Sequence, residues 1–508
     1  QALQSSRCRR SALCISKPGS GMSLGMLLVR KTHFQARQSC FSVIGAITLQ
    51  VFLACHMSFA SATTLTTTSS STITSTSTAL VRHTKLAMTT ETLAICACST
   101  SGVLKCWGAN DDGRLGYGDT MPRGHSPNQM GDHLPVVELG AGRTCVDVAA
   151  GHAQFCALLD NADVKCWGLG ESGQLGYEDR TDRGAASEHM GDALPAVELG
   201  TSCVPVGVTA GAFYSCVLCQ DGSVKCWGTG ASHPYPEFTP GHSPGTMGNS
   251  LPTLSFGTGK TVVTVSAMDG HICVLLSDDT VKCCWGNWFG GLGYGDSTHR
   301  YLSLGDSLPA VALGALTPRS VFAGFRSKTT FILTDGSVKS IGYNANYELG
   351  YNDAAHRNTA GDSLPAVSLG TGLIAVSGGF GHAYGACLIF SNQQLKCYGP
   401  AMYGYEDTVT RNGANHATMG DNLPFIDLGK GVESIAVGFD IYATGSVSVA
   451  CAVLVDDSIK CWGQSDTYGF GYEDTLARGT SPGTMGNALP NVDLGAGFQI
   501  TSTTITST

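Results

Sequence analysis

The stretch Cys156-Ala-Leu-Leu-Asp-Asn-Ala-Asp-Val-Lys-Cys-Trp-Gly168 decides the fold, because its pattern returns along most of the 508 residues. It consists of an apolar strand, a short polar turn and a second strand that ends in Trp-Gly. The glycine that closes each copy recurs at intervals of 60, 60, 58, 56, 57 and 64 residues, at Gly108, Gly168, Gly228, Gly286, Gly342, Gly399 and Gly463. Seven copies at a nearly fixed period predict a repeat architecture.

Each copy contains three short strand patterns followed by a long glycine-rich arm. In the second copy, residues 145–151 alternate between apolar and polar, and residues 155–159 and 164–167 flank the polar turn. The arm begins with Gly-Gln-Leu-Gly-Tyr-Glu-Asp and continues to Gly200. Three or four short strands in each copy of about 59 residues predict an all-β, seven-bladed β-propeller with one copy per blade.

The copies resemble repeats of the regulator of chromosome condensation family, whose fold is a seven-bladed β-propeller. The resemblance rests on Val103-Leu-Lys-Cys-Trp-Gly-Ala-Asn-Asp-Asp-Gly-Arg-Leu-Gly-Tyr-Gly-Asp119 and its equivalents, and covers roughly residues 86–500. The family's namesake is a guanine-nucleotide exchange factor for a small GTPase with a role on chromatin, and other members sit inside ubiquitin ligases. The resemblance implies the fold more firmly than an activity, because this fold hosts unrelated functions.

Four regions are predicted along the chain. They are an N-terminal targeting segment (1–62), a Ser/Thr-rich disordered linker (63–85), the propeller (86–500) and a Thr/Ser-rich tail (501–508). We expect the tail region, residues 498–508, to close the ring by supplying a strand of the first blade, where Leu86-Ala-Met88 is a poor match to residues 146–148.

The targeting segment has the layout of a secretory signal peptide. Starting at Met22 or Met26, basic residues precede an apolar run at 43–55, and Ala60-Ser-Ala62 fits a cleavage site. The run of 13 residues is shorter than the ~20 that a membrane helix needs. We therefore expect a secreted or cell-surface protein, with an uncleaved membrane anchor as the alternative and a nuclear or cytoplasmic location as a weaker one.

Cysteines recur at both ends of the strand-turn-strand unit, ten residues apart. If Leu158 faces Val164 across the turn, Cys156 faces Cys166 at a distance that a disulfide spans. The fifth copy has Thr330 and Ser340 in these positions, and the joint loss is what a covalent pair predicts. The alternative is that these cysteines are small buried apolar residues. We expect six disulfides: Cys96 with Cys106, Cys156 with Cys166, Cys216 with Cys226, Cys273 with Cys283, Cys387 with Cys397, and Cys451 with Cys461.

Six disulfides would belong to an oxidising compartment, in agreement with a signal peptide. Five further cysteines in the propeller have no assigned partner: Cys98, Cys145, Cys203, Cys219 and Cys284. Their spacing does not fit a zinc site.

A second repeated pair follows Leu-Gly-Tyr and consists of Asp and, four residues later, Arg. The pairs are Asp119 with Arg123, Asp179 with Arg183, Asp296 with Arg300, Asp353 with Arg357, Asp407 with Arg411, and Asp474 with Arg478. We interpret these pairs as structural salt bridges that fold the arm. The alternative is a ring of charged sites for a partner or Ca²⁺, because a second acidic position recurs at Asp132, Asp192, Asp306, Asp362 and Asp421. The tryptophans at 107, 167, 227, 285 and 462 occupy one position and are interpreted as core.

No catalytic motif stands out from the repeat, so the chain is not expected to be an enzyme or to hold a cofactor or metal. Gly257-Thr-Gly-Lys-Thr261 lacks the first glycine of a phosphate loop. A net charge of −9 with 14% charged residues argues against a nucleic-acid partner.

The function predicted is a non-catalytic binding scaffold, expected as a monomer, for a protein partner that the sequence does not identify. The third copy breaks the repeat at residues 232–238, which makes four residues the candidate partner-binding site: His233, Tyr235, Glu237 and Phe238. One alternative is an intracellular exchange factor or regulatory propeller for a small GTPase or chromatin. Another is an inhibitor of an extracellular enzyme, which resembles the use of this fold in a bacterial β-lactamase inhibitor protein.

Overall fold

The structure is a computed structural model that divides the chain into two units, Gln1–Ser75 and Thr76–Thr508. It describes residues 85–90, 92–229, 239–301, 304–379, 385–400, 404–409, 411, 414, 416–440, 447–464 and 469–500. All of these residues belong to the second unit. Within the described ranges, no helix has the length and apolar character to cross a membrane.

The described strands form seven antiparallel sheets, one for each predicted blade. Blade 1 contains β1 (Leu86–Met88), β2 (Ala94–Cys98) and β3 (Leu104–Gly108). Blade 2 contains β4 (Cys145–Ala150), β5 (Gln154–Leu159) and β6 (Val164–Gly168). Blade 3 contains β7 (Pro205–Ala210), β8 (Tyr214–Cys219), β9 (Val224–Gly228) and β10 (Thr253–Leu254). Blades 4 and 5 contain β11 (Val262–Met268), β12 (His271–Leu276) and β13 (Val281–Trp285), and β14 (Pro318–Gly324), β15 (Lys328–Leu333) and β16 (Val338–Ile341). Blades 6 and 7 contain β17 (Ala375–Gly379), β18 (Ala386–Phe390) and β19 (Leu395–Tyr398), and β20 (Val432–Asp440), β21 (Val447–Leu454) and β22 (Ile459–Gly463).

The arms between blades contain short 3-10 turns rather than α-helices in their described parts. These are η1 (Gly131–His133), η2 (Ser187–His189), η3 (Gly191–Ala193), η4 (Gly248–Ser250), η5 (Gly305–Ser307), η6 (His416–Thr418), η7 (Gly420–Asn422) and η8 (Gly486–Ala488). The predicted all-β, seven-bladed fold is confirmed.

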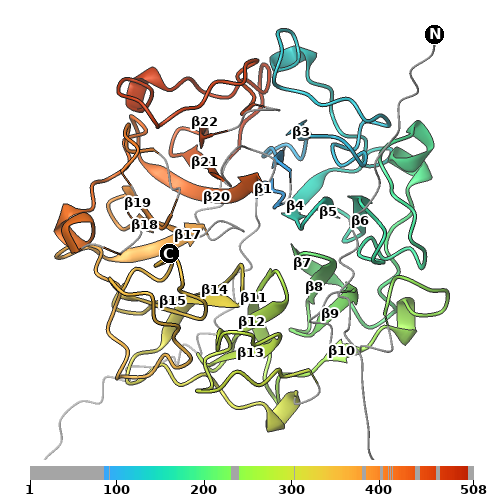
Figure 1. Cartoon of the computed structure of the whole chain (residues 1–508). Helices are drawn as coiled ribbons and strands as arrows, with labels where there is room; N and C mark the ends of the chain where they lie inside the picture. The colour runs from blue at the N-terminus through green and yellow to red at the C-terminus, as the bar shows by residue number, and fades with distance from the viewer. Residues whose placement is uncertain are drawn as a thin grey trace, which may run out of the picture. The chain divides into compact units, whose positions relative to one another are not determined.

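The blades surround a central axis, with the first strand of each blade innermost (Figure 1). Apolar side chains pack between neighbouring sheets, so that Phe155 and Trp167 of blade 2 share one core with Cys96 and Cys106 of blade 1. The middle strands are therefore covered on both sides, and β5 is buried along its whole length. This explains why the middle strands are continuous apolar runs in the sequence.

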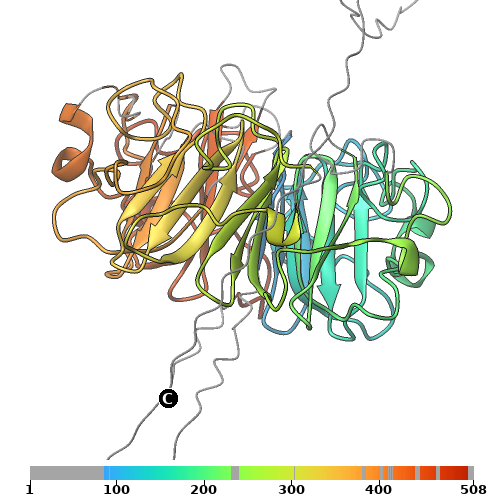
Figure 2. The ribbon, with the colours of Figure 1, turned by 90° about the horizontal axis from the view of Figure 1, so that it is seen from below.

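The antiparallel order gives the propeller two different faces, visible when the blades are seen edge-on (Figure 2). One face carries the links between inner and middle strands together with the loops that follow the outer strands. We call it the loop face. The opposite face, which we call the turn face, carries the tight turns between middle and outer strands, such as 160–163 in blade 2.

Blade 4 departs from the predicted register by one residue. Cys273 pairs with Cys283, and His271 pairs with Trp285, whereas in blade 2 the equivalent partner of Gln154 is Gly168. Trp285 therefore occupies the glycine position, at φ 84°, and Cys284 occupies the tryptophan position. The prediction that Gly286 closes this copy and that Trp285 shares the tryptophan position was wrong. One additional residue, Cys284, shifts the end of the strand.

Both ends of the described propeller contribute to the inner edge of blade 1. Leu86 pairs with Ala97 in blade 1, and Val148 pairs with Ala157 in blade 2, so Leu86 is equivalent to Val148. The sequence alignment placed Leu86 opposite Val146 instead, two residues earlier. The shift arises because the link between β1 and β2 is two residues longer than the link between β4 and β5. The Thr100 N–H donates to Gln499 O at 2.8 Å, as the Asp160 N–H donates to Thr144 O at 3.0 Å in blade 2.

Ile500 lies beside this contact and is 1% exposed. Residues 498–500 thus reach blade 1 without forming a named strand. Residues 501–508, the rest of the predicted closing segment, lie outside the described residues.

Candidate functional site

The partner-binding residues predicted from the third copy lie outside the described residues. His233, Tyr235, Glu237 and Phe238 belong to the range 230–238, so the structure gives no account of them. A candidate site has to be sought where the described blades differ from one another. The disulfides, salt bridges and buried lysines that recur from blade to blade stabilise the fold and do not distinguish one blade from another.

The six expected cysteine pairs face each other in the structure and are joined as disulfides. Each links directly opposed residues of a middle and an outer strand, with Cα atoms 4.0 to 4.1 Å apart. The bonds join Cys96 to Cys106, Cys156 to Cys166, Cys216 to Cys226, Cys273 to Cys283, Cys387 to Cys397, and Cys451 to Cys461. In blade 5 the same positions are opposed, and Thr330 and Ser340 form a hydrogen bond of 2.9 Å between their hydroxyl groups. A polar cross-strand contact therefore takes the place of the disulfide.

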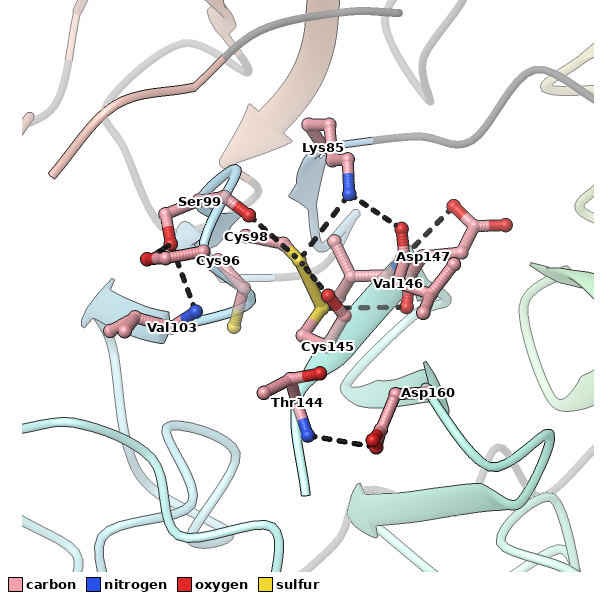
Figure 3. Close-up of a disulfide and its surroundings, with 12 residues drawn as sticks. Lys85, Cys96, Cys98, Ser99, Val103, Thr144, Cys145, Val146, Asp147 and Asp160 are labelled. Carbon is pink, nitrogen blue, oxygen red and sulfur yellow. Dashed lines mark hydrogen bonds between the residues drawn. A yellow bond between two sulfur atoms is a disulfide. The ribbon is translucent and has the colours of Figure 1, made fainter. Parts of the chain in front are cut away.

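Two further disulfides use four of the five unassigned cysteines. Cys98 of β2 is joined to Cys145 of β4, which connects blades 1 and 2, with Cα atoms 6.0 Å apart (Figure 3). Beside it, the Lys85 ammonium donates to Val146 O at 2.7 Å, which ties the start of the described chain to blade 2. Cys203 is joined to Cys219 within blade 3. Neither pair repeats along the chain, so the repeat could not reveal them.

Cys284 is the free cysteine among the described residues, and it is fully buried. Burial raises the pKa of its thiol well above the ordinary value. A buried, protonated thiol is a poor nucleophile, so this position does not provide a reactive site.

The six Asp-Arg pairs are salt bridges with a common geometry, and their charged atoms lie 2.6 to 2.8 Å apart. They join Arg123 to Asp119, Arg183 to Asp179, Arg300 to Asp296, Arg357 to Asp353, Arg411 to Asp407, and Arg478 to Asp474.

A tyrosine completes each of these arrangements. In blade 2, the Arg183 guanidinium lies 4.4 Å from the centre of the Tyr177 ring. The hydrogen bond from Arg183 holds the pKa of Asp179 below its ordinary value. The Tyr177 hydroxyl in turn accepts from the Cys166 N–H at 3.0 Å. Tyrosine, aspartate and arginine together hold the arm against the outer strand.

The second acidic position ties each blade to the preceding one. Asp192 accepts a hydrogen bond of 2.8 Å from the Ala141 N–H, and Asp306 accepts one of 2.9 Å from the Thr258 N–H. Asn249 makes the same contact with the Thr201 N–H. The described residues contain no group of three or more side chains that could hold a metal ion. Through these hydrogen bonds, the carboxylates of Asp192 and Asp306 cap turns of the preceding arm.

A buried lysine on each outer strand was missed in the sequence, although it recurs in Val-Lys-Cys-Trp and its variants. The ammonium group of Lys165 donates to Gly191 O at 2.8 Å, and that of Lys282 donates to Gly305 O at 2.9 Å. Lys460 reaches both its own arm, at Gly486 O, and the preceding arm, at Leu428 O. Burial lowers the pKa of these lysines. Their role is to hold the arms together.

Among the described residues, blades 4 and 5 differ from the others in a group of aromatic side chains on the loop face. We define this aromatic patch as Trp288, Phe289, His299, Tyr301, Tyr343 and His356. Trp288 is 43% exposed and Phe289 is 36% exposed, whereas the other five tryptophans of the chain are buried. At the positions of Trp288 and Phe289, blade 2 has Glu171 and Ser172.

Ring contacts connect the members of the patch. Trp288 lies 4.8 Å from His299, which is stacked on Tyr301 at 5.3 Å. Phe289 of blade 4 lies 4.7 Å from Tyr343 and 5.1 Å from His356, both in blade 5. The patch therefore bridges two blades.

Two buried asparagines fix the loops that carry the patch. Asn287 is 0% exposed; its amide donates to Asp296 O and Thr298 O, and its carbonyl accepts from the Leu292 N–H. Asn344 makes the same set of contacts in blade 5. The backbone N–H of each asparagine donates to a histidine Nδ1, in His299 at 2.8 Å and in His356 at 2.9 Å.

Arg326 connects the patch to the loops around the central axis. Its guanidinium lies 5.0 Å from the centre of the Tyr343 ring, and its backbone N–H donates to Asp269 Oδ2 at 3.1 Å. Burial raises the pKa of Asp269. Around the axis, small and apolar residues of the inner strands line an open cavity of about 220 Å³. The patch is thus the more distinctive candidate for a binding surface.

The chain matches parts of several known proteins, and no family model matches it. It is 29% identical to the human E3 ubiquitin-protein ligase HERC2 over 195 residues, which is 38% of this chain and 4% of HERC2. It is 26% identical over 267 residues to protein pim1 of Schizosaccharomyces pombe, or 50% of this chain and 45% of pim1. The chain therefore spans less than half the length of these relatives.

Solved structures show the same fold at lower identity. Yeast RCC1 (Prp20), solved bound to Kap60, matches with a TM-score of 0.56 at 16% identity, covering 85% of this chain and 90% of that one. Human WBSCR16 matches with a TM-score of 0.53 at 14% identity, covering 70% of this chain and 84% of that one. At these identities the likeness shows the fold alone.

Proposed function

We propose that this chain, which is an RCC1-like repeat β-propeller, is a non-catalytic scaffold that is secreted or displayed at the cell surface and binds a protein partner. The observation that carries the proposal is the aromatic patch on the loop face of blades 4 and 5. Its exposed Trp288 and Phe289 stand where blade 2 presents Glu171 and Ser172.

Aromatic side chains of this kind favour a protein partner. Tryptophan, tyrosine and arginine are enriched among the residues that dominate binding energies at protein interfaces. The patch provides Trp288 and Tyr343, with Arg326 stacked beside it. Single exposed apolar residues are ordinary on a protein surface, but a connected group is a mark of an interaction site. Met121 and Leu476, each 64% exposed, are apolar residues outside this group.

The cysteine pairing supports the extracellular part of the proposal. Eight disulfides among the described residues are typical of an oxidising compartment, and the N-terminal sequence resembles a signal peptide. The alternative is an intracellular regulatory propeller. It draws on a solved relative, Prp20p, described together with its binding to Gsp1p and histones. An inhibitor of an extracellular enzyme is a special case of the main proposal, in which the partner is an enzyme.

The test is site-specific photo-crosslinking on the surface of the cells that secrete the protein. A benzophenone amino acid replaces Phe289 in one variant and Ser172, the equivalent residue of blade 2, in a matched control. We expect one partner to crosslink from position 289 and not from position 172. The identified partner is then titrated against the unlabelled protein.

The double substitution Trp288→Glu and Phe289→Ser should weaken binding by about 30-fold or more, which corresponds to about 2 kcal/mol at an interface hot spot. Leu476→Ser, which removes a more exposed apolar residue in blade 7, should leave the affinity unchanged. Equal crosslinking from both positions, or equal affinity of the double variant and the wild type, would contradict the proposal. If the protein stays inside the cells and crosslinks there to a GTPase or a histone, the result favours the intracellular alternative.

A further inference from the structure

We infer that the aromatic patch is a pH-dependent surface, ordered at neutral pH and loosened by acid through His299 and His356; as a statement about partner binding, this rests on the proposed function. The inference comes from the hydrogen bonds that position the patch. They require two imidazole rings to be neutral.

In each of the two loops, a histidine Nδ1 is the acceptor of a backbone N–H. The Asn287 N–H donates to Nδ1 of His299, and the Asn344 N–H donates to Nδ1 of His356. A backbone N–H can only donate, so Nδ1 must carry a lone pair and the proton must lie on Nε2. When the imidazole is protonated, both ring nitrogens become donors. Protonation therefore removes the bond, because the new N–H at Nδ1 faces the backbone N–H of the asparagine and neither group can accept.

The lost bonds lie at the base of the patch. Asn287 and Asn344 are both 0% exposed, so their N–H groups have no access to water in the folded loops. An unpaired buried donor is costly, and the loop has to move to hydrate it. Asn287 directly precedes Trp288 and Phe289, and Asn344 directly follows Tyr343. Movement at these two points displaces the rings that form the patch.

Other blades show that the position does not require a histidine. In blade 2 the equivalent residue is Asp182, whose carboxylate accepts from the Gly170 N–H at 2.8 Å. Blade 1 has Pro122 in this position and blade 7 has Ala477. Histidine thus occupies this position in the two blades that carry the patch, whereas blades 1, 2 and 7 have other residues at the same position.

The charged groups in the two histidine loops and in the elements packed on the patch are two Asp-Arg pairs, Arg326 and Asp269. Asp296 is already bound to Arg300, and Asp353 is already bound to Arg357. Tyr301 is stacked on His299, and Tyr343 is stacked on His356. The Arg326 guanidinium lies 5.0 Å from the centre of the Tyr343 ring, and the Arg326 backbone N–H donates to Asp269.

Imidazole is the side chain that ordinarily changes charge between pH 5 and 8. Acidification in this range should therefore loosen the patch while the disulfide-linked sheets stay folded. A partner bound at neutral pH would be released by acid, with a loss of affinity of about tenfold or more for the hydrogen bonds broken.

The test follows Trp288 in the protein alone, because this is the exposed tryptophan of the six. Acrylamide quenching of tryptophan fluorescence is measured from pH 7.5 to pH 5.0, with Trp288→Phe as the variant that removes the signal. We expect the Trp288 component to become more accessible as the pH falls, with circular dichroism unchanged.

The double variant His299→Asp and His356→Asp, which copies blade 2, should show no such transition because a carboxylate still accepts the N–H bond in this range. A flat profile in the wild type, or the same transition in the double variant, would overturn the inference. Failure of the proposed function has a separate readout. If partner affinity is insensitive to Trp288→Glu with Phe289→Ser while the fluorescence transition is present, the patch is pH-dependent but is not the binding site.

Discussion

Blade 2 and blade 4 have the same framework and different loops. Both have a disulfide between the middle and outer strands, a buried lysine bonded to its own arm, and an Asp-Arg pair packed on a tyrosine. On the loop face, blade 2 presents Glu171 and Ser172, whereas blade 4 presents Trp288 and Phe289. The comparison separates the shared contacts that stabilise every blade from the exceptions, which are where we propose that a partner binds.

The largest effect should come from the shared disulfides. Replacing both members of a pair by alanine, Cys156→Ala with Cys166→Ala or Cys273→Ala with Cys283→Ala, should lower the free energy of unfolding by about 2–3 kcal/mol in each blade, because the unfolded chain gains conformational freedom. Denaturant unfolding under non-reducing conditions measures this. A cost in one blade and none in the other would break the equivalence of the two frameworks.

The buried lysines should have the next largest effect. Lys165→Met and Lys282→Met each leave a carbonyl oxygen without its charged donor, at Gly191 and Gly305. We expect each to lower the free energy of unfolding by about 1–3 kcal/mol. Lys260→Met, which changes a partly exposed lysine beside Asp278, is the control and should cost less. Equal effects at all three positions would mean that burial of the lysine does not matter.

The Asp-Arg pairs should contribute less, because their carboxylates are partly exposed. Arg183 holds the pKa of Asp179 below its ordinary value, so this pair stabilises the fold above the ordinary aspartate range near pH 4 and loses that contribution as the pH falls further. Asp179→Asn should therefore cost less than about 1 kcal/mol at pH 7. The difference from the wild type should shrink as acid is added, as thermal unfolding at pH 7 and pH 3 would show. A difference that grows in acid would contradict this sign.

Exchanging the loops should have the smallest effect on stability. Trp288→Glu with Phe289→Ser gives blade 4 the residues of blade 2, and Glu171→Trp with Ser172→Phe does the reverse. These side chains lie at the surface, so each exchange should change the free energy of unfolding by about 0.5 kcal/mol or less. Thermal unfolding of both variants tests this. A large loss in the first variant would make the patch part of the framework.

Local, repeated features were accessible from the sequence, and isolated or long-range ones were not. The seven-bladed fold followed from the spacing of the Trp-Gly motif, and the pairing of Cys156 with Cys166 followed from opposed strands on either side of one short turn. The link between Cys98 and Cys145 spans 47 residues and occurs once, so no pattern could reveal it.

The other omissions have different causes. Lys165 recurs as regularly as its neighbouring cysteine, but a charged residue within a strand pattern ordinarily indicates a position exposed to solvent rather than a buried one. The additional Cys284 disguised the register of blade 4 because Trp-Gly followed it directly. Trp288 and Phe289 interrupt the repeat, but the sequence analysis does not single them out. The contacts of Phe289 with Tyr343 and His356 depend on how blades 4 and 5 pack together.

The most direct test of the account is a count of free thiols, by alkylation and mass spectrometry, in the denatured protein secreted from cells. Eight disulfides use sixteen of the cysteines in the described residues, and Cys284 is the seventeenth. The account predicts one alkylated thiol in this region before reduction and seventeen after it. Seventeen free thiols before reduction, in protein retained inside the cell, would contradict a disulfide-linked extracellular scaffold and favour the intracellular alternative.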